Sequence, residues 1–215
     1  MSSRAVFLDR DGVLNRKQPP STYVTNPGQL DVLAGVGKAV RRLNDAGYLS
    51  IVVTNQRGIG RGLMSESDLN AIHQKLVAEI AVDGAVLDEI RHCPHDYSSP
   101  HDYSSPHDYS SGDNTAGCRC RKPAPGMVLD AIAEHDIDRS ASILIGDSDT
   151  DIAAAAAAGI DGIFIGDAAE VDRWPSDAAR PVAVHRDLSA AVDWFLSTVS
   201  ARSSHRHQRQ TEDSK

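Results

Sequence analysis

Three apolar, β-like runs of this chain each stop at a polar residue suited to phosphate or metal chemistry. The runs lead into Asp9, Thr54 and Asp147, and a basic segment around Lys122 lies between the second and the third. In open α/β sheets, active sites form where buried strands deliver polar side chains at their carboxyl ends. The pattern therefore predicts an α/β fold with its functional site at one edge of the sheet.

The rest of the chain alternates between strand-like and helix-like segments. Ser65 is suited to cap a helix, with Asp68 three positions later as the acid of a capping box. Gly47 and Gly159 are suited to end two other helices. Such alternation favours right-handed crossovers and a mainly parallel, Rossmann-like sheet in three layers. We predict strands at 5–8, 49–53, 87–92, 142–145 and 162–165, and helices at 36–46, 65–81, 125–134 and 149–158.

Length and charge exclude several classes of protein. We expect one domain over residues 1–199 and a disordered polar tail at 200–215, for which a basic interaction arm is the alternative. The net charge of −8, from 22 basic and 30 acidic residues, argues against a nucleic-acid partner. No apolar run approaches the roughly 18 residues of a membrane span. The first strand also begins too early for a signal peptide, so we expect a cytoplasmic protein.

The hexapeptide Pro-His-Asp-Tyr-Ser-Ser occurs three times in succession over residues 94–111. Six residues are too few for a helical solenoid unit, and tyrosine is the only apolar residue among them. We interpret the repeats as the duplication of one loop segment. The alternative is a dedicated role in gathering metal or binding a partner.

Asp9 and Asp11 form an Asp-x-Asp pair directly after the first strand. Two carboxylates at this spacing can share one divalent cation and one phosphoryl group. One can attack phosphorus and form an aspartyl-phosphate. The other can protonate the leaving oxygen and then deprotonate the attacking water. By itself the pair could also be a turn or part of a calcium-binding loop.

The other three segments favour the catalytic interpretation. Thr54 and Asn55 offer neutral donors for phosphate oxygens, and Lys122 offers a positive charge for the transition state. Asp147 adds a hard oxygen ligand, so Mg²⁺ is the expected cofactor. A helix cap at Thr54 or Asp147, or a surface cation at Lys122, would each be unremarkable alone, but their coincidence in this order indicates a phosphatase.

The chain resembles the haloacid dehalogenase (HAD) superfamily of phosphatases, whose motifs run Asp-x-Asp, Thr/Ser, Lys and Asp. The resemblance covers roughly residues 4–166 and implies that Asp9 is the nucleophile and Asp11 the general acid and base. It further implies that Asp11 binds Mg²⁺ through its backbone carbonyl and that Asp147 completes the site. Thr54 and Lys122 would hold the phosphoryl group. The interval between Asp11 and Thr54 is too short for a large cap domain.

The three cysteines lie in one region, at 93–120, and their odd number excludes a complete disulfide framework. Cys93-Pro-His95 and Cys118-Arg-Cys120 form two arms that could bind Zn²⁺ as a closed structural site. Free cysteines without metal are the alternative. The repeats offer His101 and His107 as substitutes, but adjacency to Cys93 favours His95 as the fourth ligand.

Within the family, the zinc loop followed by Arg121-Lys122-Pro123 is similar to two groups, the heptose 1,7-bisphosphate phosphatases and the histidinol-phosphatases. The runs TNQRGIGRG and RKPAPGM match the heptose group better. Ser148 departs from that group, which often has lysine there, and Arg57 or Arg61 would have to supply the missing charge. The resemblance implies a substrate pocket lined by Asn15, Thr54, Asn55, Gln56, Arg57, Arg121 and Lys122.

The expected activity is therefore hydrolysis of the C7 phosphate of D-glycero-D-manno-heptose 1,7-bisphosphate, with Mg²⁺ at the site and Zn²⁺ in the loop. The alternatives are a histidinol-phosphate phosphatase or a broader sugar-phosphate phosphatase. A zinc-binding interaction module without activity is the non-enzymatic alternative. The resemblance also implies a monomer, with an open cleft that has the zinc loop as one wall.

Overall fold

The computed structural model describes residues 2–19, 21–96 and 118–199. A six-stranded sheet in the order β3-β2-β1-β4-β5-β6 has every strand parallel to its neighbours. Residues 188–199 form a further helix. The strands are β1 (Ala5–Leu8), β2 (Leu49–Asn55), β3 (Glu89–Cys93), β4 (Ile143–Gly146), β5 (Asp161–Ile165) and β6 (Ala183–His185). The helices are α1 (Val36–Asp45), α2 (Glu66–Ala81), α3 (Gly126–Glu134), α4 (Asp149–Ala158) and α5 (Ala168–Val171), with 3-10 turns at Pro27–Gln29 and Arg139–Ala141.

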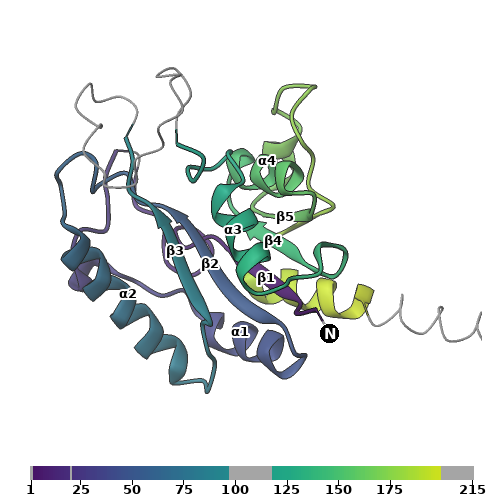
Figure 1. Cartoon of the computed structure of the whole chain (residues 1–215), viewed down its shortest axis with the longest axis horizontal. Coiled ribbons are helices and arrows are strands. Elements are labelled where there is room, and N and C mark those ends of the chain that lie inside the picture. Colours follow the sequence, from purple (N-terminus) through teal and green to yellow (C-terminus); the bar gives the residue numbers. More distant parts are fainter. Residues whose placement is uncertain (1, 20, 97–117, 200–215) are drawn as a thin grey trace, which may run out of the picture.

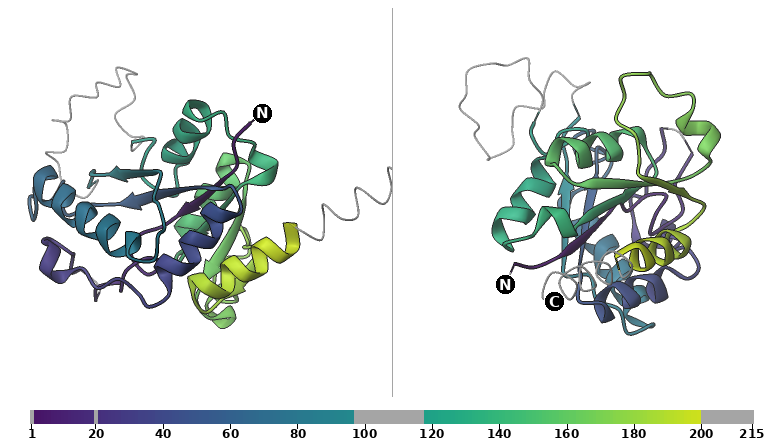
Figure 2. Two further views of the ribbon diagram at one scale, coloured as in Figure 1. Left: turned by 90° about the horizontal axis from the view of Figure 1, so that it is seen from below. Right: turned by 90° about the vertical axis from the view of Figure 1, so that its right-hand side faces the viewer.

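The sheet is covered on both faces (Figures 1 and 2). Helices α1, α2 and 188–199 pack on one face, and α3 and α4 pack on the other. When every strand of a sheet is parallel, the helices that connect the strands cover both faces of the sheet. This is the three-layer, Rossmann-like architecture that the sequence predicts.

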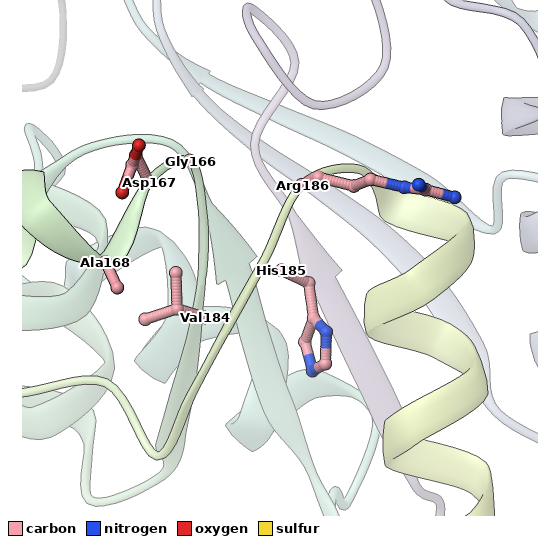
Figure 3. A pocket seen from close by; sticks show the side chains of 6 residues that line it. All are labelled: Gly166, Asp167, Ala168, Val184, His185 and Arg186. Atoms are coloured by element: carbon pink, nitrogen blue, oxygen red, sulfur yellow. The ribbon is translucent and has the colours of Figure 1, made fainter.

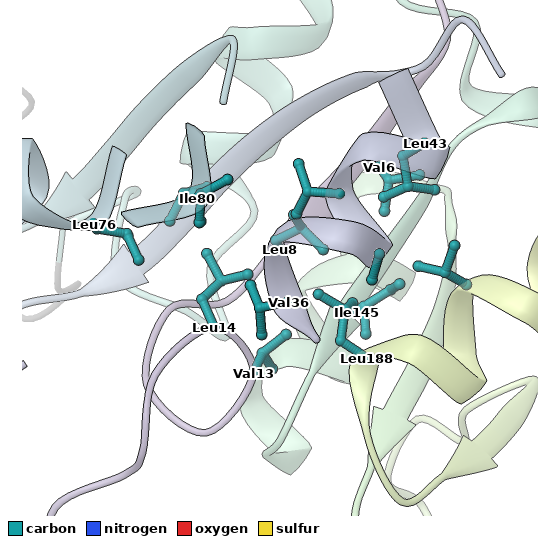
Figure 4. Close-up of a cluster of buried hydrophobic side chains, with 14 of the residues drawn as sticks. Val6, Leu8, Val13, Leu14, Val36, Leu43, Leu76, Ile80, Ile145 and Leu188 are labelled. Atoms are coloured by element: carbon teal, nitrogen blue, oxygen red, sulfur yellow. The ribbon is translucent and has the colours of Figure 1, made fainter. Parts of the chain in front are cut away.

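Strand β1 lies at the centre of the core, where its side chains alternate between the two faces. Val6 and Leu8 face the first layer with Leu43 and Leu188, as Figure 4 shows. The other two residues of β1, including Phe7, face the α3–α4 layer. All four side chains of β1 are fully buried, so the strand end that follows them is fixed on both sides.

Most predicted elements are present with small shifts at their ends. The predicted bounds of β1 and α4 are correct, and Ser65 caps α2 in a capping box with Asp68. Strand β2 extends two residues beyond the prediction, to Asn55, because β3 pairs with it as far as Cys93. The repeats beyond Asp96 and the tail at 200–215 lie outside the described residues.

The C-terminal quarter contains elements that the periodicity did not predict. Helix α5, strand β6 and the helix at 188–199 all follow the last predicted strand. The segment between β1 and α1 contains a 3-10 turn that is capped by Asn26. Within the described residues, no helix has both the length and the apolar character needed to cross a membrane.

The strand order fixes where a site can form. From β1 the chain first extends the sheet toward β3, and it later returns to place β4 on the other side of β1. The carboxyl ends of β1 and β4 therefore flank the point where the direction reverses, which is where ligands bind in such sheets. The backbone N–H of Asp9 donates to the carbonyl of Ile145 at 2.9 Å, so the two strand ends are joined directly.

Candidate active site

Lys122 lies at the centre of the site that forms between β1 and β4. Its Nζ lies 2.8 Å from Asp9 Oδ1, 2.5 Å from Asp151 Oδ1 and 2.7 Å from the carbonyl oxygen of Val53. The lysine side chain is 3% exposed, and the side chains of Asp9 and Asp151 are 11% and 0% exposed. One buried cation thus joins the ends of β1 and β2 to the first turn of α4.

Asp151 is a site residue that the sequence analysis missed. It is the third residue of α4, and its carboxylate accepts a hydrogen bond from the backbone N–H of Ser148 at 3.0 Å. The pattern Ser148-x-x-Asp151 is a capping box, which explains the position without any function. The signal that could have identified it is its distance of four residues from Asp147, which places it one helical turn further along the same strand-to-helix junction.

The side chain of Asp11 points into a separate hydrogen-bond network. Asn15 Nδ2 donates to Asp11 Oδ1 at 3.0 Å, and Gln56 Nε2 donates to Oδ2 at 3.0 Å. Arg10 donates to both carboxylate oxygens, at 3.0 and 2.8 Å, from a side chain that is only 1% exposed. His73 Nε2 lies 3.5 Å from the same guanidinium. Asn15 and Gln56, expected in the substrate pocket, therefore both contact the second aspartate of the pair.

Burial and nearby charge set opposite protonation tendencies for the two aspartates. Burial raises the pKa of Asp9 to about 7, although Lys122 acts in the opposite direction. Burial also acts to raise the pKa of Asp11, but Arg10 and the hydrogen bonds from Asn15 and Gln56 outweigh it and lower that pKa. Asp11 is therefore held as a carboxylate in this arrangement.

Burial and nearby charges also oppose each other in setting the pKa values of Lys122 and Asp147. Burial acts to lower the pKa of Lys122, but the Asp151 and Asp9 carboxylates outweigh it and raise that pKa. Burial raises the pKa of Asp147, against the effect of Lys17. The charge of Lys122 is therefore retained at neutral pH, which is the form that can bind phosphate oxygens.

Asn55 fixes the backbone of Lys122. Its amide nitrogen donates to the Lys122 carbonyl oxygen at 3.1 Å, and its amide oxygen accepts from the Lys122 N–H at 3.1 Å. Thr54, 1% exposed, accepts from Gln56 Nε2 at 2.9 Å. The end of β2 thus positions both the lysine and the amide that contacts Asp11.

The acidic cluster has a donor set that fits Mg²⁺. Asp9, Asp147 and Asp151 each offer a carboxylate oxygen, and these atoms lie within 4.8 Å of one another. Oxygen ligands around one octahedral Mg²⁺ lie about 3 to 4 Å apart, so small movements would suffice. The Asp11 side chain is outside this cluster. Gly12 passes so close that an added Cβ would lie 2.0 Å from Asp147 Oδ2, and its φ of +96° also requires glycine.

Lys17 is a second cation beside these carboxylates. Its Nζ lies 2.7 Å from Asp147 Oδ2, and its side chain is 57% exposed. The adjacent position at Ser148, where the heptose group often has lysine, carries no charge. Lys17 therefore supplies a positive charge at the carboxylate of Asp147, next to Ser148. No sequence motif had identified Lys17 as a site residue.

The two cysteine arms meet in one cluster. Cys93 Sγ lies 3.4 Å from Cys118 Sγ and 3.4 Å from His95 Nδ1. Cys120 Sγ lies 3.0 Å from Cys118 Sγ and 3.3 Å from His95 Nδ1. All three cysteines are free thiols, since these separations far exceed the roughly 2 Å of a disulfide.

The donor set of this cluster fits Zn²⁺. With metal–ligand bonds of about 2.0 to 2.3 Å, tetrahedral ligand atoms lie about 3.5 Å apart, close to the spacing here. Hydrogen bonding to Cys118 raises the pKa of Cys93 to about 12 and also raises that of Cys120. Without a cation these thiols thus stay protonated. His95 occupies the fourth position, and His101 and His107 lie outside the described residues.

Three arginines contact the loop that carries this cysteine–histidine cluster. Arg121 donates from Nη1 to the carbonyl oxygen of His95 at 3.2 Å. Arg57 and Arg61 both form ion pairs with Asp96, at 2.9 and 2.5 Å. The expected substrate-binding residues thus contact the loop that carries the candidate Zn²⁺ ligands.

A separate hollow of about 440 Å³ lies at the carboxyl ends of β5 and β6. Figure 3 shows it between the turn after β5 and the end of β6. None of the predicted site residues lines it, so its position indicates no role in the chemistry described above. Its lining residues are Gly166, Asp167, Ala168, Val184, His185 and Arg186.

Comparison with known proteins identifies similar proteins with named activities. A HAD-hydrolase-like family model matches residues 119–191. The D-glycero-beta-D-manno-heptose-1,7-bisphosphate 7-phosphatase of Rhodopseudomonas palustris is 39% identical over 158 residues, which cover 74% of this chain and 81% of that one. The D-glycero-D-manno-heptose-1,7-bisphosphate 7-phosphatase of Thermosynechococcus vestitus is 37% identical over 207 residues, covering 94% of this chain and 100% of that one.

The fold agrees with a solved structure of the same kind. The D,D-heptose 1,7-bisphosphate phosphatase of Bordetella bronchiseptica, solved with magnesium and phosphate, superposes with a TM-score of 0.75. It is 33% identical and covers 91% of this chain and 99% of its own. With the fold, the order of the motifs and the extent of these matches in agreement, the chain belongs to the HAD phosphatase family.

Proposed function

We propose that this protein is a Mg²⁺-dependent phosphatase that hydrolyses the C7 phosphate of D-glycero-D-manno-heptose 1,7-bisphosphate. The observation that carries the proposal is the buried Lys122, which joins Asp9 and Asp151 at the point where the strand order reverses. The relatives named as heptose bisphosphate 7-phosphatases supply the substrate class. We assign the activity to residues 1–199. The cytoplasmic location and the monomeric state remain predictions from the sequence.

In the first step, a carboxylate oxygen of Asp9 attacks phosphorus, and the bond between phosphorus and the C7 oxygen breaks. The product is an aspartyl-phosphate on Asp9 and a free sugar hydroxyl, whose proton comes from Asp11. Lys122 and Thr54 hold the phosphoryl oxygens while charge builds up on them. Lys122 already lies 2.8 Å from Asp9, so its charge meets the phosphoryl group at the nucleophile.

In the second step, Asp11 takes a proton from water, and the water oxygen attacks phosphorus. The bond to Asp9 breaks, which releases inorganic phosphate and restores the carboxylate. The contacts of Asp11 with Arg10, Asn15 and Gln56 stabilise its carboxylate, the form needed for this step. The first step requires the protonated form, so at least one of these contacts must open when the substrate binds.

Asp9, Asp147, Asp151 and the backbone carbonyl of Asp11 would hold Mg²⁺, which supplies Lewis-acid charge neutralisation for the phosphoryl oxygens. A cation there would also keep Asp9 deprotonated, against the burial that raises its pKa to about 7. Lys17 would be displaced from Asp147 when the metal binds.

We assign a structural role to Zn²⁺ at Cys93, His95, Cys118 and Cys120. The four donors form a closed set, which is typical of structural sites, and Arg121 lies between this loop and Lys122 in sequence. The sugar and its second phosphate would contact Arg57, Arg121 and the segment 54–56, beside Asn15. Lys17 is a further candidate to contact that phosphate once it leaves Asp147.

The test is phosphate release in the presence of Mg²⁺ from four substrates. These are both anomers of heptose 1,7-bisphosphate, fructose 1,6-bisphosphate and histidinol phosphate. The proposal predicts the highest kcat/KM for a heptose bisphosphate, with no release by Asp9→Asn, whose folding is checked by thermal unfolding. A higher kcat/KM for histidinol phosphate would contradict the substrate assignment, and turnover by the variant would contradict the nucleophile.

A further inference from the structure

Three arginines contact two consecutive residues of the zinc loop, His95 and Asp96. The carbonyl oxygen of His95 accepts from Arg121 Nη1 at 3.2 Å. The carboxylate of Asp96 meets two arginines, one at each oxygen: Oδ1 lies 2.9 Å from Arg57 Nε and Oδ2 lies 2.5 Å from Arg61 Nε. We call His95 and Asp96 the arginine anchor. The imidazole of the same His95 faces the cysteine thiols, so the anchor is continuous with the metal cluster.

Asp96 is the most buried member of this group. Its side chain is 5% exposed, whereas those of Arg57 and Arg61 are 32% and 33% exposed. A carboxylate at this depth is stable only with charged or hydrogen-bonding partners, so its contacts with the arginines are required by its position. Both guanidinium groups thus pair with the same carboxylate.

The backbone joins the same two loops. The N–H of Gln56 donates to the Cys93 carbonyl oxygen at 2.7 Å, and the N–H of Gly60 donates to the Pro94 carbonyl oxygen at 2.9 Å. A Cβ on Gly60 would lie 2.7 Å from that same Pro94 oxygen, so the loops pack too closely for any side chain there. Segment 56–61 therefore rests directly on the metal-binding arm.

The segment that packs on the Cys93 arm also contacts Asp11 of the proposed active site. Gln56, whose backbone bonds to Cys93, donates through its side chain to Asp11 at 3.0 Å and to Thr54 at 2.9 Å. Arg57 is the next residue and Arg61 lies one short turn later. Each arginine engages Asp96 through Nε, and guanidinium N–H groups are well suited to bind phosphate oxygens.

We propose that Asp96 is a positioning residue that orients Arg57 and Arg61 toward the second phosphate of the substrate and ties their placement to the zinc loop. The proposal rests on the proposed function, because it takes the substrate to be a bisphosphate. Asp96 itself does no chemistry and does not touch the phosphoryl group that is cleaved. Removing the Asp96 carboxylate should therefore weaken binding of the second phosphate.

The test compares Asp96→Asn with Asp45→Asn, which removes a similar carboxylate from the exposed Arg41–Asp45 pair on α1. For Asp96→Asn we expect the KM for heptose 1,7-bisphosphate to rise roughly tenfold with kcat within about twofold, since misplaced binding groups weaken affinity. Hydrolysis of p-nitrophenyl phosphate, a monoester without a second phosphate, should stay within about twofold. Asp96→Glu should recover most of the loss. An equal effect on both substrates, or on neither, would overturn the proposal.

Amide hydrogen exchange provides a readout that does not depend on the substrate. Several amides of segment 57–62 donate within the loop or to Pro94, so exchange there reports how firmly the loop is held. Asp96→Asn with its zinc content intact should exchange faster over 57–62, and Asp45→Asn should not. Unchanged exchange would overturn the anchor. If the wild type fails on the bisphosphate while exchange rises in Asp96→Asn, the proposed function is wrong and the anchor stands.

If Asp96→Asn does not fold, Arg61→Lys takes its place. Lysine keeps the charge but lacks the Nε–H donor that meets Asp96 at 2.5 Å. A rise in KM confined to the bisphosphate would support the proposal. An unchanged KM would contradict it.

Discussion

Asp151 Oδ1 lies 2.5 Å from Lys122 Nζ, although neither residue would meet the other without the crossover that places β4 beside β1. Lys122 thereby has two buried carboxylate partners, Asp151 from α4 and Asp9 from β1. Two partners hold the ammonium group between the end of β1 and the first turn of α4. The charge is thus in place before any phosphate arrives, which is the preorganisation that electrostatic catalysis requires.

Replacing Asp151 with Asn should therefore lower kcat roughly a hundredfold, because it removes one partner of Lys122 and one proposed ligand of Mg²⁺. Asp149→Asn is the matched control, since Asp149 lies on the exposed face of the same first helical turn. It should remain within about twofold of the wild type. The measurement is the rate of phosphate release at saturating substrate and Mg²⁺. Equal rates for both variants would show that Asp151 is only a helix-capping residue.

Lys17→Met should lower the Mg²⁺ concentration needed for half-maximal activity by about threefold to tenfold. The Lys17 ammonium lies 2.7 Å from Asp147 Oδ2, so a metal ion at that carboxylate must displace it. Arg16→Met is the neighbouring control, because Arg16 pairs with the exposed Asp31 at 2.7 Å and does not contact the cluster. Mg²⁺ titrations of phosphate release measure both variants. A higher Mg²⁺ requirement in Lys17→Met would mean that the lysine supports metal binding.

His73 should make the folded state sensitive to acid. Burial and the nearby Arg10 lower its pKa to about 3, from 6.5. Between those values the unfolded chain binds one more proton than the folded one. The contribution of His73 to stability is therefore complete above pH 6.5 and is lost as the pH falls toward 3. Between pH 7.5 and pH 5 this amounts to about 2 kcal/mol of unfolding free energy.

The measurement is urea unfolding of metal-free wild type and His73→Gln at both pH values. His73→Gln should lose about 2 kcal/mol less than the wild type on acidification, since glutamine does not titrate. His135→Gln, at the end of α3, controls for the loss of an imidazole. The same pH dependence in wild type and His73→Gln would refute the prediction.

Removing zinc should affect substrate binding before it affects the chemistry. Arg121 donates to the carbonyl oxygen of His95, so loss of the metal loosens an arginine that we place in the substrate pocket. Chelation with an agent that spares Mg²⁺ should raise the KM for the bisphosphate roughly tenfold and lower the melting temperature. Zinc readdition should reverse both. If folding and substrate preference are unchanged after the zinc is removed, the structural role of the loop is wrong.

The sequence predicted the central sheet well because its strands are short apolar runs that stop at polar residues. Leu49–Asn55, for example, has no competing helical pattern, and its partner Ala5–Leu8 is buried on both faces. Strand β6 was missed because its three residues are too few to show a period and depend on pairing with β5. The helix at 188–199 lies beyond the part of the chain that the resemblance covers.

The sequence predicted the site residues that lie at strand ends and missed those that lie elsewhere. Residues directly at strand ends, such as Asp9 and Asp147, are visible because the change from apolar to polar marks them. Asp151 and Asp96 are not at strand ends, and their partners Lys122 and Arg61 are 29 and 35 positions away. Contacts of that kind follow from the crossovers and the loop packing, which local patterns do not encode.

The position of the phosphate that is removed from the substrate tests the proposed activity. Phosphorus NMR of heptose 1,7-bisphosphate, incubated with the protein and Mg²⁺, distinguishes the two monophosphate products. The proposed activity predicts heptose 1-phosphate and inorganic phosphate as the products, with the bisphosphate unchanged when Asp9→Asn is used. Formation of heptose 7-phosphate, or an intact bisphosphate after incubation with the wild type, would contradict it.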